Sequence, residues 1–279
     1  LSLGKPLLAV NHIEGHVHAV FLEARQHGRE PELPAVCLIV SGGHTVLYEV
    51  SADRPGPAPA GTSLHYRRIG QTRDDAAGEA YDKVARLLAL GYPGGPIIDV
   101  LAAGVDPAHS PSPEDVIRFT AVKVKGHPYD FSFSGIKTAV LYHLKKHPEY
   151  EPEIALRREA LVRGERKAAQ LRPLVSAPTL DLLASFQRIV VSELVGRTLK
   201  AAEETAARSV LVSGGVAANG ELRATFARDA SSRNLEVYFP SRELSTDNAA
   251  MIAAAAYPKF LRRDFQNESL NAVAVLPLA

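Results

Sequence analysis

The sequence predicts an α/β fold from two patterns of strand-like and helix-like segments. In the first half, three consecutive strand-like runs at residues 35–40, 45–50 and 65–69 precede a helical segment. In the second half, a buried run at 209–212 leads through a pair of glycines into a helix at 220–230. A chain of 279 residues can bury a large core, and its length fits two domains or lobes.

Composition is that of an ordinary globular protein, with 46% hydrophobic and 23% charged residues. No apolar run approaches the length of a membrane span, so no membrane partner is expected. The one cysteine, Cys37, excludes an internal disulfide and fits a reducing compartment, so a cytoplasmic location is expected. A net charge of +1 neither demands nor excludes RNA, and any RNA-binding surface would be a local patch.

The first residues predict a loop that enters a short buried strand at Leu7–Val10. The helix that follows carries His12 and His16, continues to Arg25, and places both imidazoles on one face, where they could share a metal ion. Two unrelated surface histidines are the alternative, since the chain holds ten. Glu14 lies roughly 200° round the helix from each histidine, so it points away from a shared ion. That direction argues against the metallopeptidase arrangement, in which a neighbouring Glu acts as base.

A tight glycine turn at Ser41–His44 joins the first two strand-like runs and predicts a hairpin. Residues 53–63, rich in Pro, Gly and Ala, predict a loop before the third strand.

An acidic helix is predicted from Asp74 and Asp75, which are suitable N-cap residues, to about Ala89. Asp75, Glu79 and Asp82 fall on one face of it. A solvated acidic stripe and a ligand-facing surface both remain open interpretations, because small residues between the acids allow close approach.

The middle of the chain begins with a second glycine turn at 93–96 and an irregular stretch at 107–113. Residues 130–135 alternate as a short strand does, and Ser134 is a candidate cap for a helix at 135–146.

Residues 145–172 predict an exposed basic helical segment with a mobile connection, carrying eight Lys or Arg against five Glu. A solvated face is the simpler interpretation, and an RNA-binding patch is the alternative. A long helix is predicted at about 179–207.

A third glycine turn, Ser213–Asn219, follows the buried run at 209–212 and precedes a helix, an arrangement that favours anion or nucleotide binding. A strand is predicted at 235–239 and a helix at 249–265. Asp247, just before that helix, is in isolation best explained as its N-cap.

Taken together, these segments resemble the bacterial TsaD-type tRNA N6-adenosine threonylcarbamoyltransferase family, in the actin-like ATPase superfamily. The resemblance spans nearly the whole chain apart from 53–63 and 145–172. It is carried, in this order, by Asn11–His16, Val40–Thr45, Asp74–Lys83 with Tyr92–Pro96, Asp130–Thr138, and Ser213–Asn219 with Thr246–Met251.

The resemblance implies a functional site drawn from all of these segments. One divalent metal ion, iron foremost and zinc as the second possibility, would be held by His12, His16 and Asp247. An adenine nucleotide (threonylcarbamoyl-adenylate, or ATP, ADP or AMP) would contact Ile39, Val40, Ser41, Gly42, Gly43, Asp82, Gly95 and Asn219. No residue is assigned as the catalytic base. His44 is a weak candidate, and packing in the hairpin is its simpler role.

The resemblance also implies a two-lobed actin-like (RNase H-like) α/β fold, whose N-terminal lobe is incomplete here because nothing matches the family's first phosphate loop. Residues 1–30 would be the remnant of that lobe with the metal-binding helix. Residues 31–240 would form the ligand-binding lobe, with 145–172 as a basic helical insertion, and 241–279 would return to the lobe interface.

The implied activity is transfer of threonylcarbamoyl from its adenylate to N6 of adenosine 37 in tRNAs that read codons starting with A. The implied partners are tRNA, a smaller paralogous subunit and an accessory ATPase. The alternatives are a metalloendopeptidase, a non-catalytic nucleotide-binding scaffold subunit and a small-molecule carbamoyltransferase.

Overall fold

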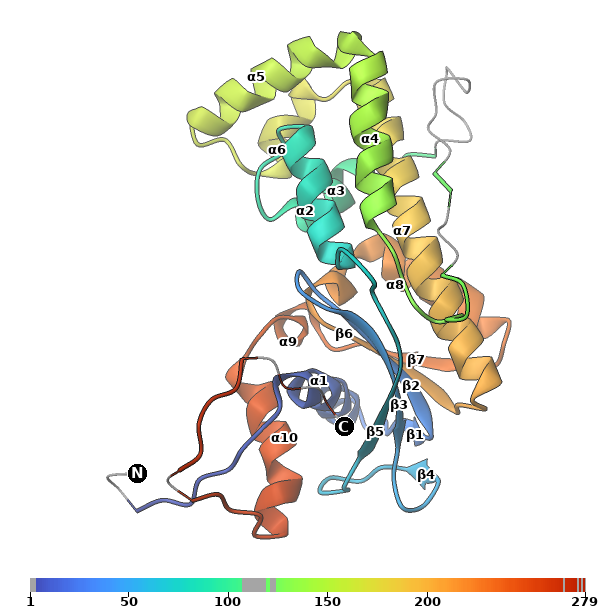
Figure 1. The fold of residues 1–279 in the computed structure, drawn as a ribbon, viewed down its shortest axis with the longest axis vertical. Helices are drawn as coiled ribbons and strands as arrows, with labels where there is room; N and C mark the ends of the chain where they lie inside the picture. The colour runs from blue at the N-terminus through green and yellow to red at the C-terminus, as the bar shows by residue number, and fades with distance from the viewer. Residues whose placement is uncertain are drawn as a thin grey trace.

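The computed structural model describes residues 4–106, 119–120, 124–267, 269–274, 276 and 278. At its centre lies a five-stranded mixed sheet with helices on both faces (Figure 1). Its strand order is β5-β3-β2-β6-β7, with β2 at Ala35–Val40, β3 at Thr45–Ser51, β5 at His65–Gln71, β6 at Ser209–Ser213 and β7 at Glu236–Tyr238. A two-stranded sheet pairs β1, Glu32–Leu33, with β4, Gly56–Pro57.

The sheet is antiparallel on one side of β2 and parallel on the other. β3 pairs antiparallel with both β2 and β5, which confirms the three consecutive antiparallel strands. On the other side, β2 pairs parallel with β6, and β6 with β7. The mixed sheet, with helices on both faces, confirms the predicted α/β class.

Most of the helices lie above the sheet in Figure 1, and the others lie on its opposite side. The upper layer holds α2 (Ala77–Leu87), α3 (Gly94–Ala102), α4 (Ser134–Lys146), α5 (Glu151–Val162), α6 (Ala168–Leu171), α7 (Ala177–Glu204) and α8 (Gly220–Ser231). The other helices are α1 (His12–Gln26), α9 (Arg242–Ser245) and α10 (Ala249–Leu261). No described helix is long and apolar enough to cross a membrane.

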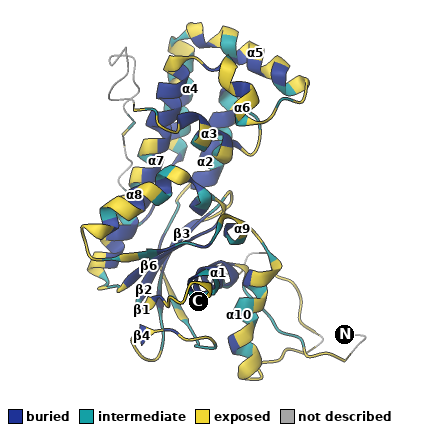
Figure 2. Ribbon diagram, turned by 180° about the vertical axis from the view of Figure 1, so that it is seen from behind, coloured by how far each residue is buried: buried dark blue, intermediate teal, exposed yellow. Residues whose placement is uncertain are grey.

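Strand β2 separates two hydrophobic cores, because its side chains alternate between the faces of the sheet. Val36, Leu38 and Val40 join the core under α2 and α7, and Cys37 and Ile39 join the core under α1. All six β2 residues are buried, so the strand appears in the sequence as a continuous apolar run (Figure 2).

Helix α2 begins later than its acidic residues predict, and the proposed N-cap role of Asp74 is wrong. The first turn of α2 is instead anchored on the hairpin, since the Ala77 N–H donates to Thr45 Oγ1 over 2.9 Å. Asp74 serves another helix: its carboxylate accepts the backbone N–H groups of Phe133 and Ser134. Asp74 therefore caps α4, the role predicted for Ser134.

Three local predictions differ from the structure for a common reason. Residues 130–135 form a single bridge, Phe131 to Thr72, and Leu7 makes a single bridge to Gln266, so neither predicted strand exists. Residues 93–96 open α3 rather than forming a free turn. Short segments with apolar or glycine-rich composition take their conformation from neighbours that the local pattern does not include. The prediction for 107–113 lies outside the described residues.

The basic segment 145–172 is helical as predicted, but not uniformly exposed. Arg157 on α5 is fully buried, and its guanidinium donates to the carbonyl oxygens of Leu88 and Leu174, each over 2.7 Å. This side chain therefore holds α5 against the α2 layer. The predicted lobe boundaries near residues 30 and 240 stay predictions.

Candidate metal centre and the glycine turns beside it

Two helix ends bring the candidate metal ligands together. Asn11 caps α1, because its Oδ1 accepts the Ile13 N–H over 2.8 Å, and this starts the helix at His12. At the other end of the chain Asn248, not Asp247, caps α10. The N-cap explanation of Asp247 is therefore wrong, and its side chain is available to face α1.

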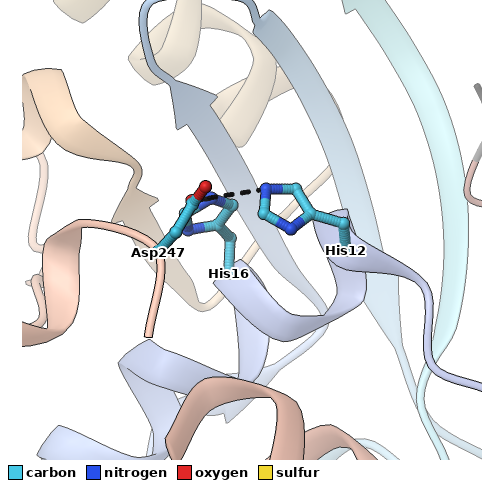
Figure 3. A group of neighbouring side chains, drawn as sticks. All are labelled: His12, His16 and Asp247. Atoms are coloured by element: carbon cyan, nitrogen blue, oxygen red, sulfur yellow. Dashed lines mark ion pairs between the residues drawn. The ribbon is translucent and has the colours of Figure 1, made fainter. Parts of the chain in front are cut away.

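The three side chains converge on one point (Figure 3). Asp247 Oδ1 lies 3.2 Å from His16 Nε2 and 3.4 Å from His12 Nε2. One ligand atom from each residue lies within 4.8 Å of the others, and in the described part of the chain no other group of three or more His, Cys, Asp or Glu residues does so. Two imidazole nitrogens and one carboxylate oxygen are a donor set that suits zinc or iron, so these residues fit the ion that the sequence implies.

Gly15 allows this convergence, because it lies where α1 and α10 cross. A Cβ atom at Gly15 would stand 3.1 Å from Ile252 Cδ1 and 3.3 Å from Met251 Cγ. On another side of α1, Glu14 pairs with Lys259 of α10 over 3.1 Å. The close crossing sets the position of the turn before α10. The pairing of Glu14 with a lysine also confirms that it points away from the two imidazoles.

The environment favours neutral imidazole, the form that binds metal. His16 is buried, and burial followed by the nearby His12 lowers its pKa, against the opposing effect of Asp247. His16 Nδ1 has no hydrogen-bond partner among the described residues. Desolvation of the ring and the nearby His12 also lower the pKa of His44, which places His44 in the electrostatic field of the same cluster.

The hairpin turn Ser41–His44 is closed by its own serine, whose Oγ accepts the His44 N–H over 3.1 Å. Within the described chain, no heavy atom would lie within 4 Å of a Cβ at Gly42 or Gly43, and neither has a positive φ. Packing and backbone conformation therefore do not require glycine at these two positions. Their lack of side chains leaves the turn open to a close-approaching ligand.

The other two glycine turns combine one structural glycine with one open glycine. A Cβ at Gly94 would lie 2.4 Å from Ala85 Cβ, and one at Gly214 would lie 2.4 Å from the Val40 oxygen. By contrast, a Cβ at Gly215 would meet no described atom within 4 Å, and one at Gly95 would meet only Tyr81 Cβ, at 4.0 Å. Each turn thus packs against the fold through its first glycine and leaves its second accessible.

Several of the predicted substrate-binding side chains already have partners in the fold. Ile39 and Val40 are fully buried, so neither residue exposes surface to a ligand in this structure. Asp82 Oδ1 accepts the Gly94 N–H over 2.7 Å and so holds the start of α3. Asn219 is 7% exposed, caps α8 through Oδ1 and donates from Nδ2 to Gln187 over 2.9 Å. Their roles as nucleotide ligands stay predictions.

One carboxylate at these turns was missed by the sequence reasoning. Asp99 on α3 accepts the Gly220 N–H over 2.9 Å and so links α3 to the start of α8. The signal was its spacing, four residues after Gly95 and therefore on the same helical face. Asp75 and Glu79, considered as supporting groups, are both paired with Lys83, over 2.7 and 2.9 Å.

Fold and site together define a class: a mixed α/β protein with a His–His–Asp cluster competent for metal and three glycine turns open to a ligand. Comparison with known proteins gives the family. A family model described as "TsaD: tRNA N6-adenosine threonylcarbamoyltransferase" matches residues 1–254. The chain therefore belongs to this family, as the sequence motifs predicted.

Curated relatives bear the same name. A protein of Koribacter versatilis, named tRNA N6-adenosine threonylcarbamoyltransferase, is 50% identical over 99% of this chain and 73% of its own length. Relatives from Syntrophobacter fumaroxidans and Thermodesulfovibrio yellowstonii are each 44% identical, over 95% and 99% of this chain and 66% and 70% of their own lengths. Among solved structures, an activator of 2-hydroxyisocaproyl-CoA dehydratase from Clostridium difficile with bound ADPNP covers 92% of this chain and 71% of its own, with a TM-score of 0.40 and 13% identity.

Proposed function

We propose that this protein transfers the threonylcarbamoyl group from threonylcarbamoyl-adenylate to N6 of adenosine 37 in tRNAs that read codons starting with A. The observation that carries the proposal is the convergence of His12, His16 and Asp247 beside the open hairpin turn, in a chain of the threonylcarbamoyltransferase family. The relatives' printed name supplies both the acceptor, tRNA adenosine, and the group that is moved.

The two imidazoles and the carboxylate would hold one divalent ion, with iron as the first candidate and zinc as the second. When bound, such an ion supplies Lewis-acid stabilisation of negative charge on a substrate oxygen. The protein contributes rigidity: α1 holds both histidines on one face, and the crossing at Gly15 holds Asp247 against them. Preorganised ligands of this kind need no rearrangement during the reaction.

An adenine nucleotide would lie against the glycine turns. The open backbone at Gly42, Gly43 and Gly215 allows a phosphate or carbonyl group to approach N–H groups without a side chain between them.

The reaction itself exchanges one bond at the carbamoyl carbon. Adenosine N6 forms a bond to that carbon, the bond from carbon to the adenylate oxygen breaks, AMP leaves, and N6 loses a proton. His44 is a weak candidate for the acceptor of that proton, and packing in the hairpin is its simpler role; burial and the nearby His12 lower its pKa, which favours the neutral imidazole. Most of the rate acceleration would come from positioning and from charge stabilisation.

A smaller paralogous subunit and an accessory ATPase would assist the transfer in the cytoplasm. The peptidase alternative is not favoured, because Glu14 is paired with Lys259 and does not lie beside the cluster. A scaffold role remains as an outcome of the test below.

The test combines metal analysis with transfer of labelled threonylcarbamoyl to tRNA, for this chain and for a chain extended at its N-terminus. Asp247→Ala is compared with Glu243→Ala, an exposed carboxylate on the neighbouring α9. Removing a hydrogen-bond partner of a metal ligand typically lowers metal affinity by roughly 10- to 100-fold. Asp247→Ala removes a ligand itself, so its loss of metal affinity should be larger. This variant should also abolish transfer, and Glu243→Ala should match the wild type. With the partner subunits present, full transfer by Asp247→Ala would instead favour a scaffold whose partner carries out the chemistry.

A further inference from the structure

A groove of about 780 Å³ opens beside the candidate metal centre. Its lining runs from the N-terminus of α1 along β3 and β5, with His12, Gly43 and His44 at one end. Mostly apolar residues of the two terminal segments, at 7–10, 270–274 and 276, complete the lining of the groove. Tyr48, Arg68 and Gln71 line it farther along the two strands. Its volume falls within the roughly 300–1,000 Å³ typical of ligand sites, so it can hold more than a single small group.

The lining of this groove has a one-sided charge. Among the described residues that line it there is no carboxylate, whereas Arg68 supplies a fixed positive charge and His12 and His44 supply imidazoles. Asn11 and Thr72 add neutral hydrogen-bonding groups. A concave surface with one fixed positive charge and no carboxylate in its described lining favours a negatively charged ligand near that charge.

Register explains why Arg68 faces the groove and its neighbour Arg67 does not. Arg68 lies opposite Tyr48, which packs in the core under α1, on the α1 face of the sheet. Arg67 lies opposite Glu49 on the other face and forms an ion pair with it. Arg68 is exposed and forms no ion pair with any described residue, so its guanidinium is available to an external anion.

The position of Arg68 separates it from the ligand site at the hairpin turn. Tyr48, its cross-strand partner, lies three residues beyond Thr45, where β3 leaves the turn. At about 3.3 Å per residue, this is roughly 10 Å from the turn. An anion at Arg68 is therefore a different group from one held at Gly42 and Gly43. β5 is also the edge strand of the five-stranded sheet (Figure 1).

We propose that Arg68 binds a backbone phosphate of the acceptor tRNA, next to the nucleotide whose base enters the metal centre. This inference rests on the proposed function and adds the path by which the RNA strand approaches. Arg68 is then a positioning residue: it holds the RNA strand along β5 and takes no part in the reaction at the His12, His16 and Asp247 cluster. A guanidinium suits a phosphate because its fork of N–H donors matches two phosphate oxygens.

The test uses a matched pair of variants on one strand, Arg68→Ala and Arg67→Ala, each of which removes one positive charge. The measurements are tRNA affinity over a range of salt concentrations, KM for tRNA, KM for threonylcarbamoyl-adenylate, and metal content. Arg68→Ala should weaken tRNA binding about 5- to 20-fold at low salt. It should also reduce the slope of log K against log salt by about 1.

In Arg68→Ala the KM for tRNA should rise, while the KM for the adenylate and the metal content stay unchanged. In Arg67→Ala the tRNA affinity and the KM for tRNA should stay within about twofold of the wild-type values. Arg68→Lys should restore the salt slope but only part of the affinity, because it restores the charge without the two parallel N–H donors of the guanidinium. Equal tRNA affinity in the two alanine variants would overturn the inference. A rise confined to the KM for threonylcarbamoyl-adenylate would overturn it too, because Arg68 would then bind the phosphate of that substrate and not a phosphate of the tRNA. If the wild-type protein transfers nothing to tRNA, the proposed function fails; if it does and Arg68→Ala behaves as wild type, only the inference fails.

Discussion

Replacing Gly78 with alanine tests how tightly α2 seats the hairpin turn beside the metal centre. A Cβ there would lie 2.6 Å from the Ser41 carbonyl oxygen and 2.8 Å from Gly42 Cα, both backbone atoms. Helix and turn would have to separate by at least 0.4 Å to relieve the first contact to 3.0 Å. Overpacking of this kind costs about 1–3 kcal/mol, and the gain in helix propensity from Gly to Ala returns only about 1 kcal/mol. The variant should therefore lose up to about 2 kcal/mol of unfolding free energy.

Gly196→Ala is the matched control, because it makes the same chemical change inside α7. There a Cβ would meet no described atom within 4 Å, so only the propensity gain applies. This variant should gain about 0.5–1 kcal/mol. Urea denaturation followed by far-UV circular dichroism measures both, and thermal melting should show shifts of opposite sign, at about 2–4 °C per kcal/mol. If Gly78→Ala is as stable as Gly196→Ala, α2 does not rest on the turn as described. Weaker AMP binding by Gly78→Ala alone would show that displacing the turn disturbs the ligand site.

Three further predictions follow from single side chains. Arg157→Met should lose about 3–5 kcal/mol in urea denaturation, because two buried carbonyls lose their donor, whereas exposed Arg158→Met should change stability by less than about 0.5 kcal/mol. Burial raises the pKa of Asp74, but hydrogen bonds from Ser132, Phe133 and Ser134 outweigh it and the net pKa is lowered. Ionised Asp74 therefore stabilises the fold above the unfolded pKa of about 3.9, and this stabilisation is lost as pH falls through the lower folded pKa. The difference in unfolding free energy between the wild type and Asp74→Asn should shrink as pH falls, and a difference that grew would contradict this sign. Gly15→Val should push α10 away from α1 and lower metal affinity in titrations with zinc, and unchanged affinity would mean that the crossing does not position Asp247.

Local patterns predicted most of the regular elements, because short-range geometry decides them. The hairpin at Ser41–His44 and the long helix α7 lie where apolar periodicity and turn residues placed them. Helix α3 was missed, since its Pro-Gly-Gly-Pro start is typical of a turn. What makes it a helix end is the packing of Gly94 against Ala85 and its bond to Asp82, neither of which appears in a local pattern.

For the candidate site too, local sequence determined some features and tertiary packing determined the others. The sequence by itself determined that His12 and His16 share a helical face, since four residues span about one turn of any α-helix. Its motifs also determined the family, which the comparisons confirm. Only the tertiary structure decided that Asp247 meets those imidazoles, that Asn219 is engaged as a cap, and that Arg68 faces a groove. Distances between remote segments depend on how helices and strands pack, and packing is a property of the whole chain rather than of any stretch of it.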